Sequence, residues 1–222
     1  MRPAIAIIDY GMGNRRSVQR ALQRAGADVR MARDAGELRT AAGLVLPGVG
    51  AFPEGMARLR ERGLDDAVRE AVAAGVPLLG ICLGMQLLFE RSSEHEHTDG
   101  LGLLSGDVER LRADGLRIPH IGWSDVTFER PCPLTDGLAA GGRSGRPFYH
   151  VHSLVARPAD PEVVAGTTVY GERFASIVAR EHVLGVQFHP EKSSRDGLEL
   201  LRAFTRLCER GRSAAGAAAL RA

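Results

Sequence analysis

This chain of 222 residues has few cysteines, a single tryptophan and a small net charge, and these shortages exclude several classes of protein. Three cysteines, an odd number without framework spacing, argue against a disulfide scaffold. A formal net charge of +2 gives no reason to expect nucleic acid or an acidic membrane as a partner. Arginine far outnumbers lysine, which we attribute to a G+C-rich genome and not to chemistry.

Long hydrophobic runs are also missing, because no apolar stretch approaches the roughly 18 residues that a membrane-spanning helix needs. The N-terminal MRPAIAIIDYG has the pattern of a strand and lacks the parts of a signal peptide. Hydrophobic residues make up 44% and charged residues 25%, the balance of an ordinary globular protein. We expect a cytoplasmic protein with a single domain over residues 1–210 and a low-complexity, disordered tail over 211–222.

The first ninety residues alternate short apolar runs with segments of helical spacing. The expected strands are 4–10, 27–32, 43–48 and 76–81. The expected helices are 18–25, a short one capped by Asp34 and Glu37, 67–75 and 85–92. Such alternation implies right-handed crossovers and a parallel sheet with helices on both faces.

The second half of the chain alternates apolar and polar residues in short runs, which suggests antiparallel strands. These runs are 106–111, 124–129, 147–156, 162–170 and 174–181. A continuous apolar strand follows at 182–188, and a final helix has Leu198, Leu201 and Phe204 at helical spacing. The predicted fold is α/β, with a mostly parallel central sheet flanked by helices on both faces and antiparallel additions in the second half.

The stretch VPLLGICLGMQLLFE, residues 76–90, places one thiol between two glycines at a strand-to-helix turn. Such a turn is the thiol form of the nucleophile elbow, in which a Cβ at Gly80 or Gly84 would crowd the bend. The turn puts Cys82 at a helix N-terminus, which favours a thiolate, and it places the backbone N–H of Leu83 to bind an oxyanion. A small core cysteine is the alternative interpretation, which we keep for the other two cysteines.

A nucleophilic thiol needs a base, and the base needs a group that orients it. His189 ends an apolar strand and is followed by Pro190 and Glu191. Because the carboxyl ends of parallel strands gather at one rim, His189 can meet Cys82 there, and Pro190 fixes the turn so that Glu191 reaches the imidazole. The turn LPGVGAF, residues 46–52, follows another strand and offers N–H groups as a second oxyanion donor.

Neither a metal nor a cofactor is expected. HEHTDG and HVHS each carry two histidines at i and i+2, but no wider set of ligands accompanies either pair. The glycines at 11 and 13 lack the third glycine of a dinucleotide-binding fingerprint.

The motifs GICLGMQ and GVQFHPEKS resemble the two signatures of the class I, triad-type glutamine amidotransferases, whose fold is flavodoxin-like. Within that class the chain is similar, over about residues 4–208, to the glutaminase subunits of imidazole glycerol phosphate synthase, from histidine biosynthesis. The stretches that carry this similarity are IIDYGMGNRRSV, LPGVGAF, GLGLLSGDVERL, PHIGW, FYHVHSL and FHPEKSS.

The resemblance implies that Cys82 is the nucleophile, His189 the general base and acid, and Glu191 the orienting carboxylate. Cys82 would attack the side-chain amide of L-glutamine, releasing ammonia and leaving a thioester that water hydrolyses to glutamate. The implied oxyanion and substrate-binding residues are Gly48, Val49, Gly50, Leu83, Gln86, His152 and Ser153.

The resemblance also implies a heterodimer with a (β/α)8 cyclase, which would use the ammonia to make imidazole glycerol phosphate and aminoimidazole carboxamide ribotide. Trp123, Tyr149 and Lys192 are implied to face that partner, although the sequence around Trp123 slightly favours a core position. The departures from the usual family pattern are Arg15, Ser124 and the segment HVHSL in place of FVHSY.

Two other functions stay open on the sequence alone. One is a glutaminase for a different synthase, such as those for pyridoxal phosphate or anthranilate. The other is a non-catalytic module on the same fold, with Cys82 as a redox-sensitive thiol, which would not need His189 or Glu191.

Overall fold

A computed structural model describes the backbone of residues 2–139, 142 and 144–219, and the side chains of these residues as far as 210. Its first half contains β1 (Ala4–Ile8), α1 (Arg15–Arg24), β2 (Asp28–Ala32), α2 (Ala35–Arg39), β3 (Gly43–Gly48), α3 (Phe52–Glu61), α4 (Leu64–Ala73), β4 (Leu78–Cys82), α5 (Leu83–Gln86), β5 (Phe89–Ser92) and β6 (Thr98–Asp99). Its second half contains β7 (Leu104–Arg110), β8 (His120–Phe128), β9 (Gly145–His152), β10 (Leu154–Pro158), η1 (Pro161–Val163), β11 (Val164–Tyr170), β12 (Glu172–Arg180), β13 (Val183–Val186), η2 (Pro190–Lys192) and α6 (Ser194–Ala219).

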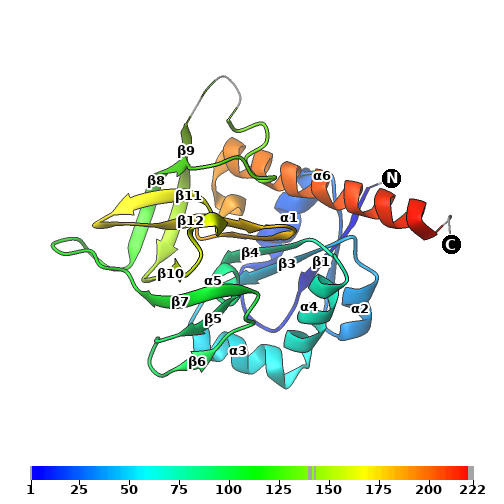
Figure 1. The fold of residues 1–222 in the computed structure, drawn as a ribbon, viewed down its shortest axis with the longest axis horizontal. Helices are drawn as coiled ribbons and strands as arrows, with labels where there is room; N and C mark the ends of the chain where they lie inside the picture. The colour runs from blue at the N-terminus through cyan, green and yellow to red at the C-terminus, as the bar shows by residue number, and fades with distance from the viewer. Residues whose placement is uncertain (1, 140–141, 143, 220–222) are drawn as a thin grey trace.

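The centre of the fold is a mixed sheet of nine strands in the order β2-β1-β3-β4-β13-β12-β11-β8-β9 (Figure 1). The strands from β2 to β13 in this order are parallel, and β12, β11, β8 and β9 extend the sheet by antiparallel pairing. The predicted α/β class is confirmed, with the antiparallel strands coming from the second half of the chain.

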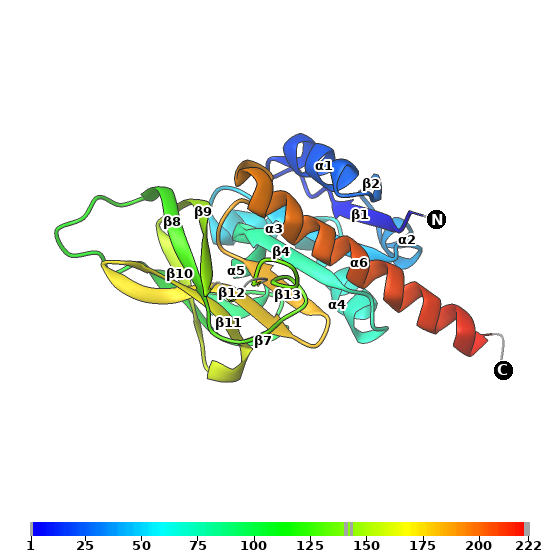
Figure 2. The same ribbon diagram turned by 90° about the horizontal axis from the view of Figure 1, so that it is seen from above.

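Strand β1 shows why helices must cover both faces of this sheet. Its side chains Ile5 and Ile7 belong to one buried cluster with α1 and α6, whereas Ala6 and Ile8 belong to another with α2, α3 and α4. Successive side chains of a strand point to opposite faces, and burying one isoleucine side chain contributes about 1.5–3 kcal/mol. An apolar run therefore needs a cover on each side, and Figures 1 and 2 show the two helical layers.

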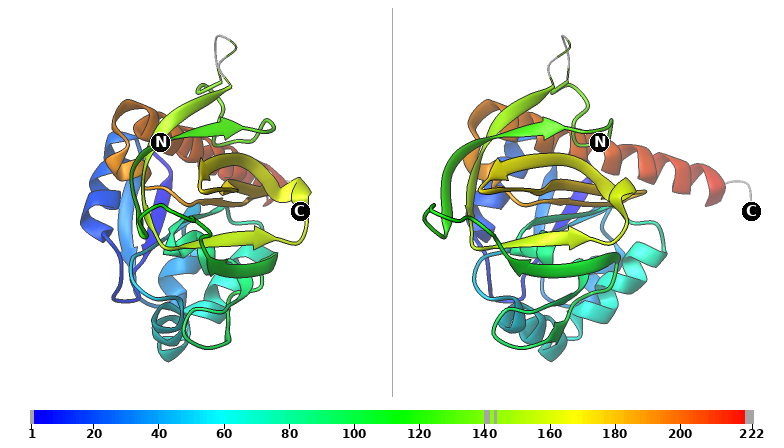
Figure 3. Two further views of the ribbon diagram at one scale, coloured as in Figure 1. Left: turned by 90° about the vertical axis from the view of Figure 1, so that its left-hand side faces the viewer. Right: turned by 60° about the vertical axis from the view of Figure 1, so that its left-hand side comes forward.

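A second sheet of four strands, in the order β10-β7-β5-β6, is not predicted by the sequence (Figure 3). The helix predicted over 85–92 is wrong, because α5 ends at Gln86 and residues 89–92 form β5. Leu101 N–H donates to the carbonyl of Leu87, and Leu103 N–H to that of Leu88, so the chain leaves the helix after one turn. Helix α3 is likewise absent from the sequence-based prediction.

The run predicted over 147–156 divides at Ser153 into two strands. β9 belongs to the nine-stranded sheet and β10 to the four-stranded sheet, so residues 152–154 connect the two. Helix α6 includes residues 211–219, and its end projects beyond the rest of the fold in Figure 2. The limits of the domain and the disordered tail stay predictions. No helix of the described residues is long and apolar enough to cross a membrane.

Candidate active site

Cys82 ends β4 in a conformation that residues with a Cβ seldom adopt. Its φ is 56° and its ψ is −114°, an arrangement that costs about 1–3 kcal/mol and is found mainly at functional sites. A Cβ on Gly80 would lie 2.6 Å from the carbonyl oxygen of Gly84, and one on Gly84 would lie 1.8 Å from that of Leu46. Both glycines are needed for the elbow to form, as the sequence predicts.

Three neighbouring parallel strands bring their carboxyl ends together around this elbow. Gly48 of β3 is the register partner of Cys82, and Val186 of β13 is the partner of Ile81. A cavity of about 200 Å³ lies at this rim, lined by Val49, Gly50, Cys82, Leu83, Gln86, Val151, His152, Ser153, Leu154, His189 and Lys192. The cavity thus brings together the predicted oxyanion and substrate-binding residues, with Gly48 beside it on β3.

His189 and Glu191 form a buried pair next to the thiol. His189 Nδ1 lies 2.9 Å from Glu191 Oε1, and the two side chains are 3% and 1% exposed. Burial by itself lowers the pKa of His189, but hydrogen bonds to Cys82 and Glu191 and their negative charges outweigh it and raise this pKa to about 10. The imidazole therefore holds a proton strongly beside the sulfur, and with Nδ1 occupied it offers Nε2 to Cys82.

Ser193 holds the turn that carries this pair, and the sequence analysis did not single it out. Its hydroxyl donates to the carbonyl of His189 at 2.7 Å and accepts from the N–H of Tyr149 at 3.0 Å. His189 N–H in turn donates to the carbonyl of Tyr149 at 2.9 Å. The turn after β13 is therefore attached to β9, which fixes where the imidazole points.

Tyr10 is a second residue that the sequence did not indicate. It is fully buried and donates its hydroxyl to the carbonyl of Pro47 at 2.8 Å. Burial and the nearby charge of Cys82 raise the pKa of Tyr10, so its proton stays on the hydroxyl. Tyr10 thereby holds the end of β3 at Pro47, the residue before Gly48, where the predicted oxyanion residues begin.

One part of the cavity wall is held by side chains that meet at one carbonyl. Gln86 Nε2 donates to the carbonyl of Leu154 at 3.1 Å, and His152 Nδ1 donates to the same oxygen at 2.9 Å. His152 Nε2 lies 3.3 Å from Nδ1 of His120. Because both ring nitrogens of His152 are occupied within the wall, the ring positions the segment and leaves polar contacts with a ligand to the backbone and to Ser153.

Trp123 is 52% exposed, so the slight preference of the sequence for a core position is wrong. Its ring meets the ring of Tyr149 edge to face, with the two ring centroids 6.1 Å apart. Nζ of Lys192, the only lysine of the chain, lies 5.9 Å from the centroid of the Tyr149 ring. Ile121, 59% exposed, shares the face, because alternate residues of β8 point the same way. We call Ile121, Trp123, Tyr149 and Lys192 the β8–β9 patch, which adjoins the cavity through Lys192.

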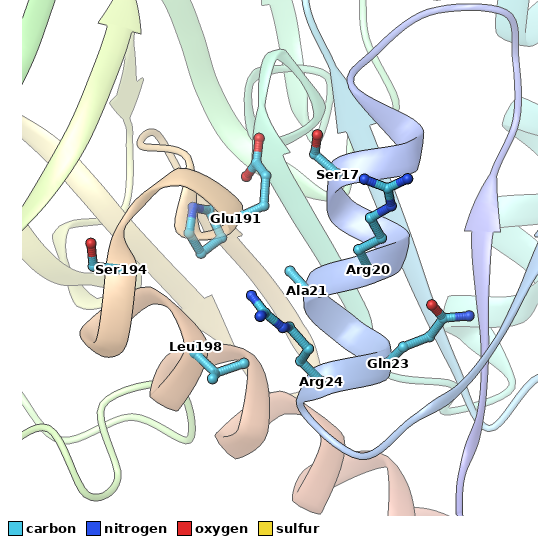
Figure 4. Close-up of a pocket in the computed structure, with 9 residues that line it drawn as sticks. Ser17, Arg20, Ala21, Gln23, Arg24, Glu191, Ser194 and Leu198 are labelled. Carbon is cyan, nitrogen blue, oxygen red and sulfur yellow. The ribbon is translucent and has the colours of Figure 1, made fainter.

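A wider groove of about 750 Å³ lies behind the histidine–carboxylate pair, between α1 and the start of α6. Arg20 and Arg24 of α1 and Glu191 line it (Figure 4). Glu191 Oε2 is buried without a hydrogen-bond partner in the described part of the chain, whereas Oε1 binds His189. Within that same part, no group of three or more histidine, cysteine, aspartate or glutamate residues could hold a metal ion.

The strained thiol, the neighbouring imidazole and the buried carboxylate, on this sheet, define a class I glutamine amidotransferase. The family model of that name, glutamine amidotransferase class-I, matches residues 6–207, and the chain belongs to this family of enzymes. Solved structures agree: a glutamine amidotransferase has a TM-score of 0.72 at 26% identity, covering 92% of this chain and 98% of that one. PurLQS from Thermotoga maritima has a TM-score of 0.75 at 22% identity, covering 93% and 99%, and supports the fold alone.

The nearer relatives carry one particular name, imidazole glycerol phosphate synthase subunit HisH. The protein of that name from Moorella thermoacetica is 54% identical over 93% of this chain and 96% of its own length. Those from Bacillus cereus and Rhodopirellula baltica are 47% and 44% identical, over 94% and 90% of this chain and 97% and 96% of their own lengths. Within the class, the chain therefore belongs to the HisH family, as the resemblance in its motifs suggests.

Proposed function

We propose that this chain is the glutaminase subunit that supplies ammonia for imidazole glycerol phosphate synthesis, using Cys82, His189 and Glu191 as its catalytic triad. The observation that supports it best is the strained elbow of Cys82 beside an imidazole that Glu191 holds at 2.9 Å. A carboxylate at Nδ1 fixes the tautomer and stabilises the imidazolium, and the pKa of His189, about 10, keeps its imidazole protonated beside the sulfur.

In the proposed reaction the Cys82 thiolate attacks the side-chain amide carbon of glutamine, and the amide oxygen becomes an oxyanion. Backbone N–H groups around Gly50 and Leu83 would stabilise that charge. His189 then gives its proton to the leaving nitrogen, so that ammonia departs and a thioester remains. His189 takes a proton from water as the water attacks the thioester, and glutamate leaves with the thiolate restored.

The partner in this proposal is a (β/α)8 cyclase that receives the ammonia and makes imidazole glycerol phosphate and aminoimidazole carboxamide ribotide. The shared name of the relatives supports it, since each is called a subunit of that synthase. The β8–β9 patch supports it as well, because an exposed tryptophan beside the cavity mouth is the kind of side chain that anchors an interface. Ammonia released at this rim would enter the partner without crossing bulk water.

The test is Cys82→Ala in the assembled complex. We expect glutamine-dependent synthesis to fall below detection, because no thioester can form, while synthesis from added ammonium salts is kept. Cys132→Ala is the matched control: this thiol is equally buried and lies outside the cavity, so the variant should keep glutamine-dependent synthesis. Full use of glutamine by Cys82→Ala would show that the nucleophile is wrongly assigned.

A further inference from the structure

Gln187 is fully buried directly after β13, two residues before His189, and its side chain reaches the thiol. Its Nε2 lies 3.8 Å from Cys82 Sγ, and its Oε1 lies 3.1 Å from Gln86 Nε2. A buried primary amide must satisfy both donors and acceptors or destabilise the fold. The contact with the sulfur is therefore part of how this amide is accommodated.

The direction of this amide is set by a backbone carbonyl. The oxygen of Leu154 can only accept, so the atom of Gln86 that lies 3.1 Å from it must be the donor Nε2. The same Nε2 contacts the side chain of Gln187, which must present its acceptor Oε1 there. The Nε2 of Gln187 is thereby turned toward Cys82, with an N–H to donate.

A second neighbour of the sulfur favours the neutral thiol. Cys82 Sγ lies 3.8 Å from the carbonyl oxygen of Val151, which can accept a proton from S–H but repels a thiolate. A donor to the charged form is needed to offset this carbonyl. Hydrogen bonds to an ionised partner are roughly twice as strong as neutral ones.

We infer that Gln187 is a further catalytic residue, whose side-chain N–H stabilises the Cys82 thiolate both before attack and when it leaves the thioester. This inference rests on the proposed function, since it assumes that Cys82 is the nucleophile. The sulfur carries negative charge both before it attacks and when it leaves, and the same N–H faces it in both steps.

The titratable groups around the sulfur are engaged in other hydrogen bonds or in proton transfer. His189 exchanges the reacting proton, with Glu191 behind it, and Tyr10 directs its own proton to the carbonyl of Pro47. His152 is occupied on both ring nitrogens. The amide of Gln187 is thus a donor to the sulfur that does not titrate.

The test compares Gln187→Met and Gln187→Glu with the wild type. Methionine keeps the length without a donor, and glutamate keeps the shape and the acceptor for Gln86 while losing the N–H. We expect the pH midpoint for iodoacetamide alkylation of Cys82, followed by mass spectrometry, to rise by about one unit or more. In the complex, kcat for glutamate release should fall roughly tenfold with KM changed less than about threefold.

Thr168→Val is the matched control, because Thr168 is equally buried in the same sheet and bonds to Ser176 at 2.7 Å, away from Cys82. It should leave the alkylation midpoint unchanged. If either Gln187 variant folds and keeps the wild-type midpoint, or if Thr168→Val shifts it equally, the inference is wrong. Glutamate also adds a negative charge that disfavours a thiolate, so if Gln187→Met fails to fold, Gln187→Leu, which has neither a donor nor a charge, decides.

The two proposals fail in different ways. Diazo-oxo-norleucine, a glutamine analogue that alkylates the nucleophile, should form an adduct on Cys82 of the wild type. No adduct, together with glutamine use by Cys82→Ala, would refute the proposed function. An adduct on the wild type with unaltered Gln187 variants would refute only the role of Gln187.

Discussion

At the scale of single residues, the site depends on two glycines, because neither has a Cβ. Gly80 and Gly84 leave room for β3, β4 and α5 to approach within distances that a Cβ would prevent. That approach holds Cys82 at a φ of 56°, which an isolated chain would avoid. The close packing that these two glycines allow therefore keeps Cys82 in its strained conformation, with its thiol at the cavity.

Gly84→Ala should disrupt this arrangement. The new Cβ would meet the carbonyl oxygen of Leu46 at 1.8 Å, and backbone cannot move aside as a flexible side chain can. We expect a loss of about 3 kcal/mol or more in the free energy of unfolding, seen as a lower Tm in a thermal melt. Gly55→Ala in α3 is the control, because the nearest atoms to its Cβ would be leucine methyl groups at 3.3–3.5 Å. Equal Tm values for the two variants would contradict this role of Gly84.

The sequence predicts the triad but misses the residues that support it. Cys82 and His189 stand out because glycines or a proline mark their turns. Gln187 lies within an apolar run, where one polar residue carries no spacing signal, and Tyr10 reads as part of a buried strand. Their roles come from contacts between distant segments, 37 residues apart for Tyr10 and Pro47 and 105 for Gln187 and Cys82.

At the scale of single elements, β9 buries two histidines that must stay neutral. Burial, followed by the nearby imidazoles, lowers the pKa of His150 to about 2 and that of His152 to about 3. In the unfolded chain a histidine has a pKa of about 6.5. The unfolded state therefore binds more protons below this pH, and the contribution of β9 to stability is lost as pH falls from about 6.5 toward 3.

His150→Phe should make the fold more resistant to acid. The His150 ring stacks on His120 and meets Phe174 and Phe188 edge-on, so a phenylalanine suits these aromatic surroundings and removes one group that must be buried uncharged. We expect the acid midpoint of unfolding, followed by circular dichroism, to move to lower pH. His97→Gln, at an exposed position, is the control and should leave the midpoint unchanged. An unmoved midpoint in His150→Phe would rule out this role for His150.

The elements that the sequence misassigns share a physical cause. The apolar residues of 85–92 are Met85, Leu87, Leu88 and Phe89, a short run that fits a helix or a strand. The strand partners of 89–92 in β7 lie more than ten residues further along the chain. The run over 147–156 is continuous in pattern, yet it turns at Ser153 because its two halves pair with β8 and with β7. Pairing between distant strands decided both cases, whereas β1, β3 and β4 are buried on both faces and are predicted correctly.

At the scale of the whole molecule, the predicted partner residues and the cavity lie on one side of the fold. Tyr149 connects them, since it contacts Trp123 through its ring and His189 through its carbonyl. A partner that covers the β8–β9 patch would also close the mouth of the cavity at Lys192. The proposed partner binding and ammonia transfer would then take place at the same surface.

Trp123→Ala should weaken the complex with the cyclase without unfolding the chain. The side chain is 52% exposed, so its loss leaves the core intact, whereas a tryptophan anchor at an interface is worth about 2 kcal/mol or more. We expect Kd from calorimetry to rise by about thirtyfold or more, with an unchanged Tm. Val169→Ala, exposed at 64% and outside the patch, is the control. Unaltered affinity in Trp123→Ala would remove the patch from the interface.

The hydrogen-bond register of β3, β4 and β13 limits where residues can be inserted into or deleted from this chain. Gly48 pairs with Cys82, and Val186 with Ile81, so the separation of Cys82 and His189 is set by counting residues along two ladders. Deleting one residue within β13 would turn each later side chain to the other face and carry His189 away from the thiol. Insertions in surface turns such as 112–118 leave that count untouched. Length variation is thus confined to the outside of the molecule, while the three central strands keep a fixed number of residues.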